Sequence, residues 1–290
     1  NLYIYTLNRI EMKKLILIIF TFSFLAANAH IEPPKTIKEK AKAKSDFLRK
    51  KTAGIKESIL YSISPDNKEV KMIHAFFDEE GREKTLFLYD KIGELSSVVA
   101  QTYDKQGNLV LDADRTPEGI MQEMNVLHYD DDGLIWNIIS YDSAWNISGS
   151  LSYEMMPETA EVYVTKTNDK HMLQYTITYR YDKGLDEGDC SGIIQTDADG
   201  KLMIRVENVF DSNGQRTRKL VFGKDDSLDF TYHYTYNTSG DFSEIHKISA
   251  DGNLQRTDVY TYNDKGFVSA VKVMDAEGKE IANRRYDYVY

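Results

Sequence analysis

The sequence predicts an all-β protein: an antiparallel meander of about 16–18 short strands, curled around its own apolar face. Three observations support this prediction. Paired turn motifs recur with a period of about 26 residues through most of the chain. The steps between turns alternate between about 12 and about 14 residues, which leaves room for a strand but not for a helical crossover. Between the turns, apolar and polar residues alternate with the period of two that separates the faces of a sheet.

The start of the chain predicts export. Residues 1–11 precede the first methionine, Met12, and we treat them as an upstream segment outside the fold. Residues 12–29 have a charged beginning, an apolar run and the small-residue cleavage site Ala-Asn-Ala, which together are typical of a signal peptide. The apolar run is shorter than the roughly 20 residues of a membrane-spanning helix. We therefore expect cleavage before His30, no stable membrane span afterwards, and a periplasmic or extracellular protein.

Residues 30–59 form a basic arm that we predict to be helical or disordered. Between residues 35 and 59 there are nine Lys or Arg and three acidic residues, with two prolines in front. Two interpretations remain open for the arm, namely contact with an anionic surface and a solvated linker. The whole chain carries a formal net charge of −10, which argues against nucleic acid as a partner.

Residues 60–290 form the predicted β-repeat domain. Its turns follow the pattern Tyr/Phe-Asp-x-x-Gly, in which Asp accepts backbone hydrogen bonds and Gly adopts a positive φ. One series of glycines is Gly81, Gly107, Gly133, Gly188, Gly214, Gly240 and Gly266, and the other is Gly93, Gly119, Gly200, Gly252 and Gly278, with Asp226 in place of one glycine. Three extra residues within 181–188 put the two halves out of phase. The glycines of these two series are missing between Trp145 and His171, although the spacing continues on either side.

The strands of the repeat domain have one apolar, aromatic face and one polar face. The apolar face includes Leu202, Ile204, Val206, Phe230, Tyr232, Tyr234, Tyr260 and Tyr286. Tyr234, Tyr260 and Tyr286 are each separated by one full repeat, so we expect them to form one column on every second strand. The column is either part of the core or a ligand-facing row of rings. These three tyrosines are the candidate site residues of the sequence.

The repeat resembles a known family. Residues 103–109 read YDKQGNL and residues 89–95 read YDKIGEL, with looser copies such as Tyr129–Gly133. This pattern resembles the YD repeat of the RHS family of secreted and surface proteins of bacteria, over roughly residues 77–290. In that family the repeats form a β-sheet shell or spiral, often around a toxic cargo. This chain is far shorter and has no attached toxin domain, so the resemblance implies a small, free-standing repeat protein.

The sequence predicts no catalytic residue, cofactor or metal. The six histidines lack zinc-binding spacing, and no phosphate loop or GxSxG motif is present. Cys190 is the only cysteine and lies in an acidic stretch, where we expect a half-buried, unreactive thiol. Turn formation explains the many carboxylates, including those of residues 130–133 and 197–200, whose surroundings lack the last ligand of a calcium-binding loop.

We therefore expect an exported, non-enzymatic repeat protein that provides a binding or structural surface, with a protein or carbohydrate ligand. An outer-membrane β-barrel is one alternative, favoured by the alternating strands and by aromatic residues up to the C-terminus. Against it, the connections are short, and Arg256, Asp258, Glu280 and Arg284 interrupt the apolar face. A secreted enzyme such as a glycosidase is the other alternative.

Overall fold

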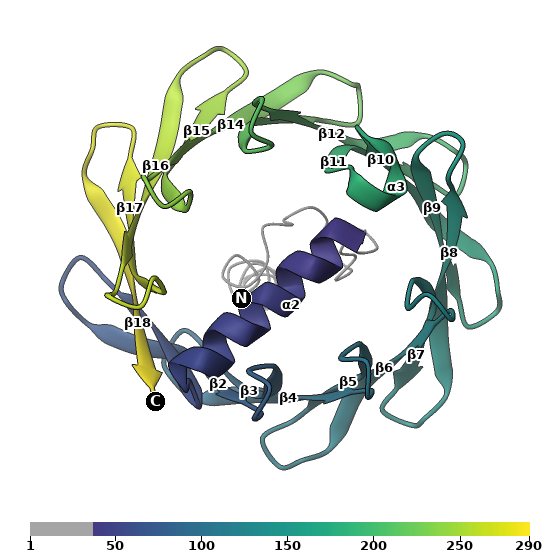
Figure 1. Ribbon diagram of the computed structural model, residues 1–290, viewed down its shortest axis with the longest axis horizontal. Helices are drawn as coiled ribbons and strands as arrows, with labels where there is room; N and C mark the ends of the chain where they lie inside the picture. Colours follow the sequence, from purple (N-terminus) through teal and green to yellow (C-terminus); the bar gives the residue numbers. More distant parts are fainter. Residues whose placement is uncertain (1–36) are drawn as a thin grey trace, which may run out of the picture.

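The computed structural model describes residues 37–290, which form a closed 18-stranded β-barrel with a helix across one end (Figure 1). The upstream segment, the signal peptide and the predicted cleavage site lie outside the described residues. The helices are α2 (Ile37–Ala53) and α3 (Gly184–Glu187). The strands are β1 (Glu57–Ile63), β2 (Glu69–Phe77), β3 (Glu83–Tyr89), β4 (Leu95–Tyr103), β5 (Leu109–Arg115), β6 (Met121–Tyr129), β7 (Ile135–Asp142), β8 (Ile147–Met156), β9 (Glu161–Asn168), β10 (Leu173–Tyr181), β11 (Cys190–Asp197), β12 (Leu202–Phe210), β13 (Arg216–Phe222), β14 (Leu228–Tyr236), β15 (Phe242–Ser249), β16 (Leu254–Tyr262), β17 (Val268–Asp275) and β18 (Glu280–Val289).

The barrel is an uninterrupted antiparallel meander. Each strand pairs with the one before it and the one after it, and β1 pairs with β18, where Leu60 lies opposite Tyr286. The predicted all-β meander is therefore confirmed. The curled sheet closes completely, which removes the exposed edges that an open sheet of this length would present.

The turns combine a side-chain acceptor with a left-handed residue. In the β3–β4 turn, Oδ1 of Asp90 accepts hydrogen bonds from the backbone N–H groups of Ile92 (2.9 Å) and Glu94 (3.0 Å), and Gly93 has φ +88°. Where the glycines are missing, Trp145 and His171 adopt the same conformation, with φ +65° and +59°. The spacing continues because the turn keeps its geometry without glycine.

The two series of turns lie at opposite ends of the barrel, since successive strands run in opposite directions. The three extra residues fall in the β10–β11 connection, which contains α3. Most hairpins also have a β-bulge beside the turn; in the β14–β15 hairpin, for example, the register shifts between Thr235 and Tyr236. Bulges strengthen the local twist of a sheet and so help it to curve. The first strand begins at Glu57, inside the segment that the sequence assigned to the arm.

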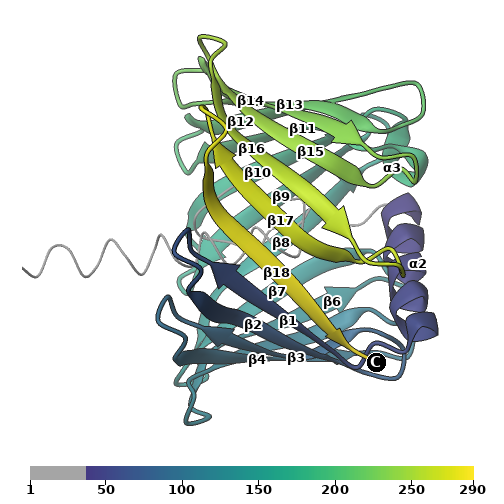
Figure 2. The same ribbon diagram turned by 90° about the vertical axis from the view of Figure 1, so that its left-hand side faces the viewer.

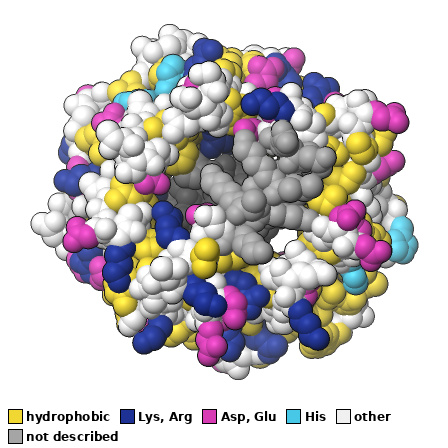
Figure 3. All heavy atoms as spheres, viewed as in Figure 1, with side chains coloured by type: hydrophobic (Ala, Val, Ile, Leu, Met, Phe, Trp, Pro, Cys, Tyr) yellow, Lys and Arg dark blue, Asp and Glu magenta, His cyan; other side chains and the backbone are white. Residues whose placement is uncertain are grey.

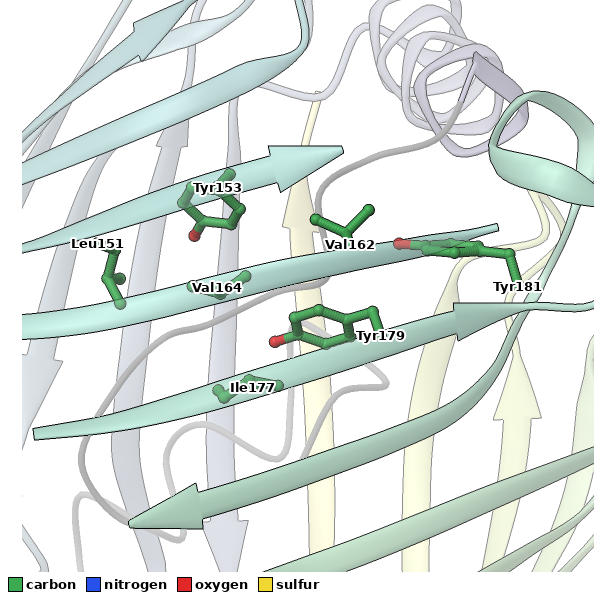
Figure 4. Packing of buried hydrophobic residues seen from close by; sticks show 7 residues of the cluster. All are labelled: Leu151, Tyr153, Val162, Val164, Ile177, Tyr179 and Tyr181. Atoms are coloured by element: carbon green, nitrogen blue, oxygen red, sulfur yellow. The ribbon is translucent and has the colours of Figure 1, made fainter. Parts of the chain in front are cut away.

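Alternate side chains along a barrel strand point inward and outward. Side chains on the concave, inner face converge and bury one another. We therefore identify the inner face in β8–β10 by its buried side chains and trace it to the other strands through the pairing of residues. In β8–β10 the inner side chains form a packed cluster: Leu151, Tyr153, Val162, Val164, Ile177, Tyr179 and Tyr181 (Figure 4). Their outer neighbours, such as Glu154 and Arg180, are exposed. The core therefore lines the inside of the wall.

Helix α2 lies across one mouth of the barrel (Figure 2). Phe47 packs edge-on against Tyr103, with ring centroids 6.4 Å apart, and Lys50 lies over the ring of Phe77 and 3.6 Å from a carboxylate oxygen of Glu83. The helix is held by contacts with the ends of β2–β4 and with the β16–β17 turn. Charged side chains of both signs surround this end (Figure 3).

Candidate functional site on the inner wall

The three tyrosines of the predicted column lie on the inner face of β14, β16 and β18. Tyr234 is 9% exposed, and Tyr260 and Tyr286 are half-buried. In the strand register, Tyr234 pairs with Ile245 on β15, which in turn pairs with Asp258 on β16. In the same way, Tyr260 pairs with Val271 on β17, which pairs with Arg284 on β18. The column therefore advances two residues for every two strands. This stagger follows the tilt of the strands and keeps the rings at one level around the barrel.

Cations and aromatic rings alternate on the same wall. The guanidinium of Arg216 lies 4.6 Å from the ring centroid of Tyr234, and Nζ of Lys247 lies 4.3 Å from that of Phe230. Phe242 links the column, with ring centroids 5.6 Å from Tyr234 and 6.4 Å from Tyr260. Such a surface can stack flat groups and attract anions.

Next to the column lie three charged side chains that the sequence showed as interruptions of the apolar face. Arg256 donates a hydrogen bond of 2.7 Å to Oδ2 of Asp258, which is 4% exposed. Oδ1 of Asp258 is buried and accepts no hydrogen bond from the described residues. Arg284 is 9% exposed, and within residues 37–290 its guanidinium forms no ion pair or hydrogen bond. The wall therefore presents both an unused acceptor and an unused donor.

Burial shifts the pKa values of the tyrosines and of one lysine on this wall. It raises the pKa values of Tyr234 and Tyr286 to about 12 and raises the pKa of Tyr260 further, with the nearby Asp258 acting in the same direction. The hydroxyls are therefore protonated at neutral pH and can donate hydrogen bonds. Burial, and secondarily the nearby Arg216, lowers the pKa of Lys219 to about 7. Lys219 lies 5.8 Å from the ring centroid of Tyr232.

The opposite wall is acidic. Asp112 and Asp114 point inward from β5, and Glu123 and Asn125 from β6, as the pairing of Asp112 with Asn125 shows. β5 and β6 lie across the barrel from β14 and β15 (Figure 1). Asp112 and Asp114 are in the middle of a strand, so the prediction that turns account for all the carboxylates was wrong for them. A count of turn motifs does not separate strand carboxylates from turn carboxylates.

The other predicted features have structural roles. Oδ1 of Asp197 accepts backbone hydrogen bonds from Asp199 (3.0 Å) and Lys201 (2.9 Å), as in the other turns. Cys190 is half-buried at the start of β11, and its thiol donates a hydrogen bond to the carbonyl of Gly192.

In the part of the chain that the structure describes, no group of three or more His, Cys, Asp or Glu could hold a metal ion. Neither helix within residues 37–290 is long and apolar enough to cross a membrane.

No protein-family model matches the chain, and no curated protein matches it. Several solved structures are similar at low identity. A porin-like protein from Bacteroides uniformis is 11% identical with a TM-score of 0.45, over 81% of this chain and 98% of that one. TcdB2-TccC3 is 10% identical with a TM-score of 0.30, over 78% of this chain and 15% of that one. A LolA superfamily protein from Nitrosomonas europaea is 10% identical with a TM-score of 0.20, over 84% of this chain and 91% of that one. At these values the similarities carry no argument about function.

Proposed function

We propose that this chain is an exported, non-enzymatic binding protein built from an RHS-like YD repeat, and that the inner wall of its barrel binds the ligand. One observation carries the proposal: aromatic rings, cations and unused polar groups are concentrated on the inner face of β13–β18. A wall that served only to hold the barrel together would be expected to pair its buried charges. A carbohydrate suits the wall, because sugar rings stack on tyrosine and sugar hydroxyls bond to charged groups.

The outer face supports a water-exposed barrel over the outer-membrane alternative. Along β8–β18 the outward side chains are largely polar or charged and include Glu154, Arg180, Glu207, Arg218 and Lys272. An Arg or Lys facing lipid costs about 2–4 kcal/mol at the middle of a bilayer. Several such residues around more than half of the circumference would oppose insertion.

The acidic wall gives a second candidate, a glycoside hydrolase. Asp112 and Asp114 are two residues apart on one face of β5, which places their Cα atoms about 6.5 Å apart. Carboxyl groups at roughly 5–9.5 Å are used by glycosidases. Product release from a bound oligosaccharide that disappears in both Asp112→Asn and Asp114→Asn would favour this candidate over simple binding.

Binding can be tested with a matched pair of variants. The mature protein is prepared without detergent and titrated by calorimetry with a panel of soluble oligosaccharides and peptides. Tyr286→Leu removes a ring from the inner wall. Tyr163→Leu removes a ring from the outer face of β9, where Tyr163 is 38% exposed. We expect Tyr286→Leu to weaken ligand binding by about tenfold, the loss of one stacking contact, and Tyr163→Leu to leave it unchanged.

The result that overturns the proposal is equal affinity in both variants or a larger loss in Tyr163→Leu. The absence of binding to any member of the panel also counts against it. A protein that stays in the membrane fraction until detergent is added would support the outer-membrane alternative.

A further inference from the structure

Arg284 is the most unusual group on the inner wall. Its side chain is more than nine-tenths buried, and its guanidinium has no acceptor among the residues that the structure describes. A buried cation without a partner is costly, whereas the same cation paired with an anion is offset by Coulomb attraction and hydrogen bonds. A guanidinium is also suited to a planar carboxylate, which it binds through two parallel hydrogen bonds. Arg284 is therefore available to an anionic acceptor from outside the described chain, which would offset the cost of burying its side chain.

The surroundings define what else the ligand must carry. Across β17 from Arg284 lies Tyr260, and Val271 is the only residue between them in the register. Asp258, two residues before Tyr260 on the same strand, has one carboxylate oxygen bound to Arg256 and the other unused. A ligand that reaches Arg284 therefore also meets an aromatic ring and an oxygen that accepts a hydrogen bond.

The charge of the cluster favours a hydroxyl over an ammonium as the donor to Asp258. Arg256, Asp258 and Arg284 together carry a net charge of +1. A ligand ammonium at Oδ1 of Asp258 would lie beside the guanidinium of Arg256, which is bound to the same carboxylate, and like charges repel strongly in a buried site. A single anion balances the cluster, and a neutral hydroxyl satisfies Asp258 without adding charge.

We propose that Arg284, Asp258, Tyr260 and Tyr286 form a subsite for a sugar that bears a carboxylate, as in a uronic acid. Arg284 binds the carboxylate, Oδ1 of Asp258 accepts from a ring hydroxyl, and the tyrosines contact the sugar ring. This inference rests on the proposed function, since it names the ligand class of the same inner wall.

The test compares two forms of one ligand. A tetrasaccharide of galacturonic acid and its methyl ester differ in the carboxylate charge and in one methyl group per sugar, and both are titrated into the mature protein by calorimetry. We expect the acid to bind about tenfold or more tightly than the ester, the value of a charge-assisted hydrogen-bonded pair. Arg284→Gln should abolish this preference and leave the affinity for the ester unchanged. Arg218→Gln, on the exposed outer face of β13, should have no effect.

Stability provides a second readout. Because Arg284→Gln removes an unpaired buried charge, the melting temperature of the ligand-free variant should equal or exceed that of the wild type while its affinity for the acid falls. A variant that loses both affinity and stability would indicate a structural role for Arg284 and overturn the subsite.

Other outcomes separate this inference from the proposed function. If acid and ester bind equally and Arg284→Gln changes neither, the subsite is wrong and the binding function stands. If an acidic tetrapeptide or inorganic phosphate binds Arg284 more tightly than the sugar acid, the ligand class is wrong. If no saccharide or peptide binds, both proposals fail.

Discussion

Two stretches of the barrel wall use the same repeat in different ways. In β8–β18 the apolar and aromatic side chains point inward, and the outer face is polar. In β2–β7 large apolar side chains lie on both faces: Ile73 and Leu88 point inward and pack with Leu60, whereas others point outward. Phe76 and Phe87 pack on the outer face, with ring centroids 5.6 Å apart, and Ala113, Met121 and Met124 form a buried cluster. The inner face of β5 and β6 carries Asp112, Asp114 and Glu123 instead.

The difference shows that strand spacing and the choice of face are separate properties. Turns that return at the same even spacing give strands whose equivalent residues share a face in both stretches. Which face is apolar is decided by the composition of each strand. In β5 the alternation in LVLDADR places Leu111 and Ala113 outside and the aspartates inside. The inner wall is therefore acidic on one side of the barrel and aromatic and basic on the other.

The largest expected effect comes from forcing the second stretch to present the wrong face. One residue inserted after Val259, in β16, would turn Tyr260 outward and shift every later residue of the strand. We expect the loss of a cooperative urea-unfolding transition, whereas three residues inserted in the β10–β11 connection should be tolerated because native extra residues already lie there. Similar melting temperatures for the two insertions would contradict a wall with one buried face.

Removing one aromatic ring from each stretch compares the stability contributed by an inner and an outer side chain. Tyr260→Ala removes an inner ring and should cost about 3–5 kcal/mol, as for a large aromatic removed from a core. Phe87→Ala removes an outer ring of the first stretch and should cost about 1–2 kcal/mol, because water already reaches part of it. Urea unfolding measures both. A cost for Tyr260→Ala below about 1 kcal/mol would make the column a free binding groove and not a part of the core.

The first stretch also supports helix α2, and two glycines test this contact. Gly81 and Gly107 have similar φ values of +78° and +89°, so alanine strains the backbone equally at each. A Cβ atom on Gly81 would lie 2.5 Å from the carbonyl oxygen of Phe47, whereas one on Gly107 would have no neighbour closer than 3.9 Å. We expect Gly81→Ala to cost about 1–2 kcal/mol more than Gly107→Ala and to speed tryptic cleavage at Lys50. Equal cleavage rates would show that α2 is not held there.

The smallest expected effect concerns Lys219, on the inner wall of the second stretch. Its folded pKa of about 7 lies below the unfolded value of 10.5, so the unfolded state binds more protons between these pH values. The ionisation of Lys219 therefore makes the protein more stable as the pH rises from about 7 towards the unfolded pKa of 10.5. Lys219→Met should raise the melting temperature at pH 7 by about 2–4 °C and flatten this rise. Lys201→Met, in an exposed turn, serves as the control, and an unchanged pH profile for Lys219→Met would contradict the shift.

Local sequence patterns were enough to specify the strands, the turns and the antiparallel order. Asp and Gly at fixed offsets specify turns locally, and the short steps between successive turns leave no other connection. The sequence also placed Tyr234, Tyr260 and Tyr286 on one face, because period-two alternation needs only the backbone. It could not reveal the bulges, which depend on the pairing of two strands, or the left-handed Trp145 and His171, which the surrounding turn holds in place.

Three features follow from the folded barrel and not from any local pattern: the pairing of β1 with β18, the position of α2 across a mouth, and the face of each strand that points inward. These features depend on accumulated twist over 18 strands and on contacts between residues more than 200 positions apart, which no local pattern encodes. Closure also gave the charged residues of the apolar face their place. Arg256, Asp258 and Arg284 appeared along the chain as isolated interruptions. The register of β16–β18 puts them on one face, and closure turns that face into a buried inner wall, where the cost of an unpaired charge gives them a candidate role.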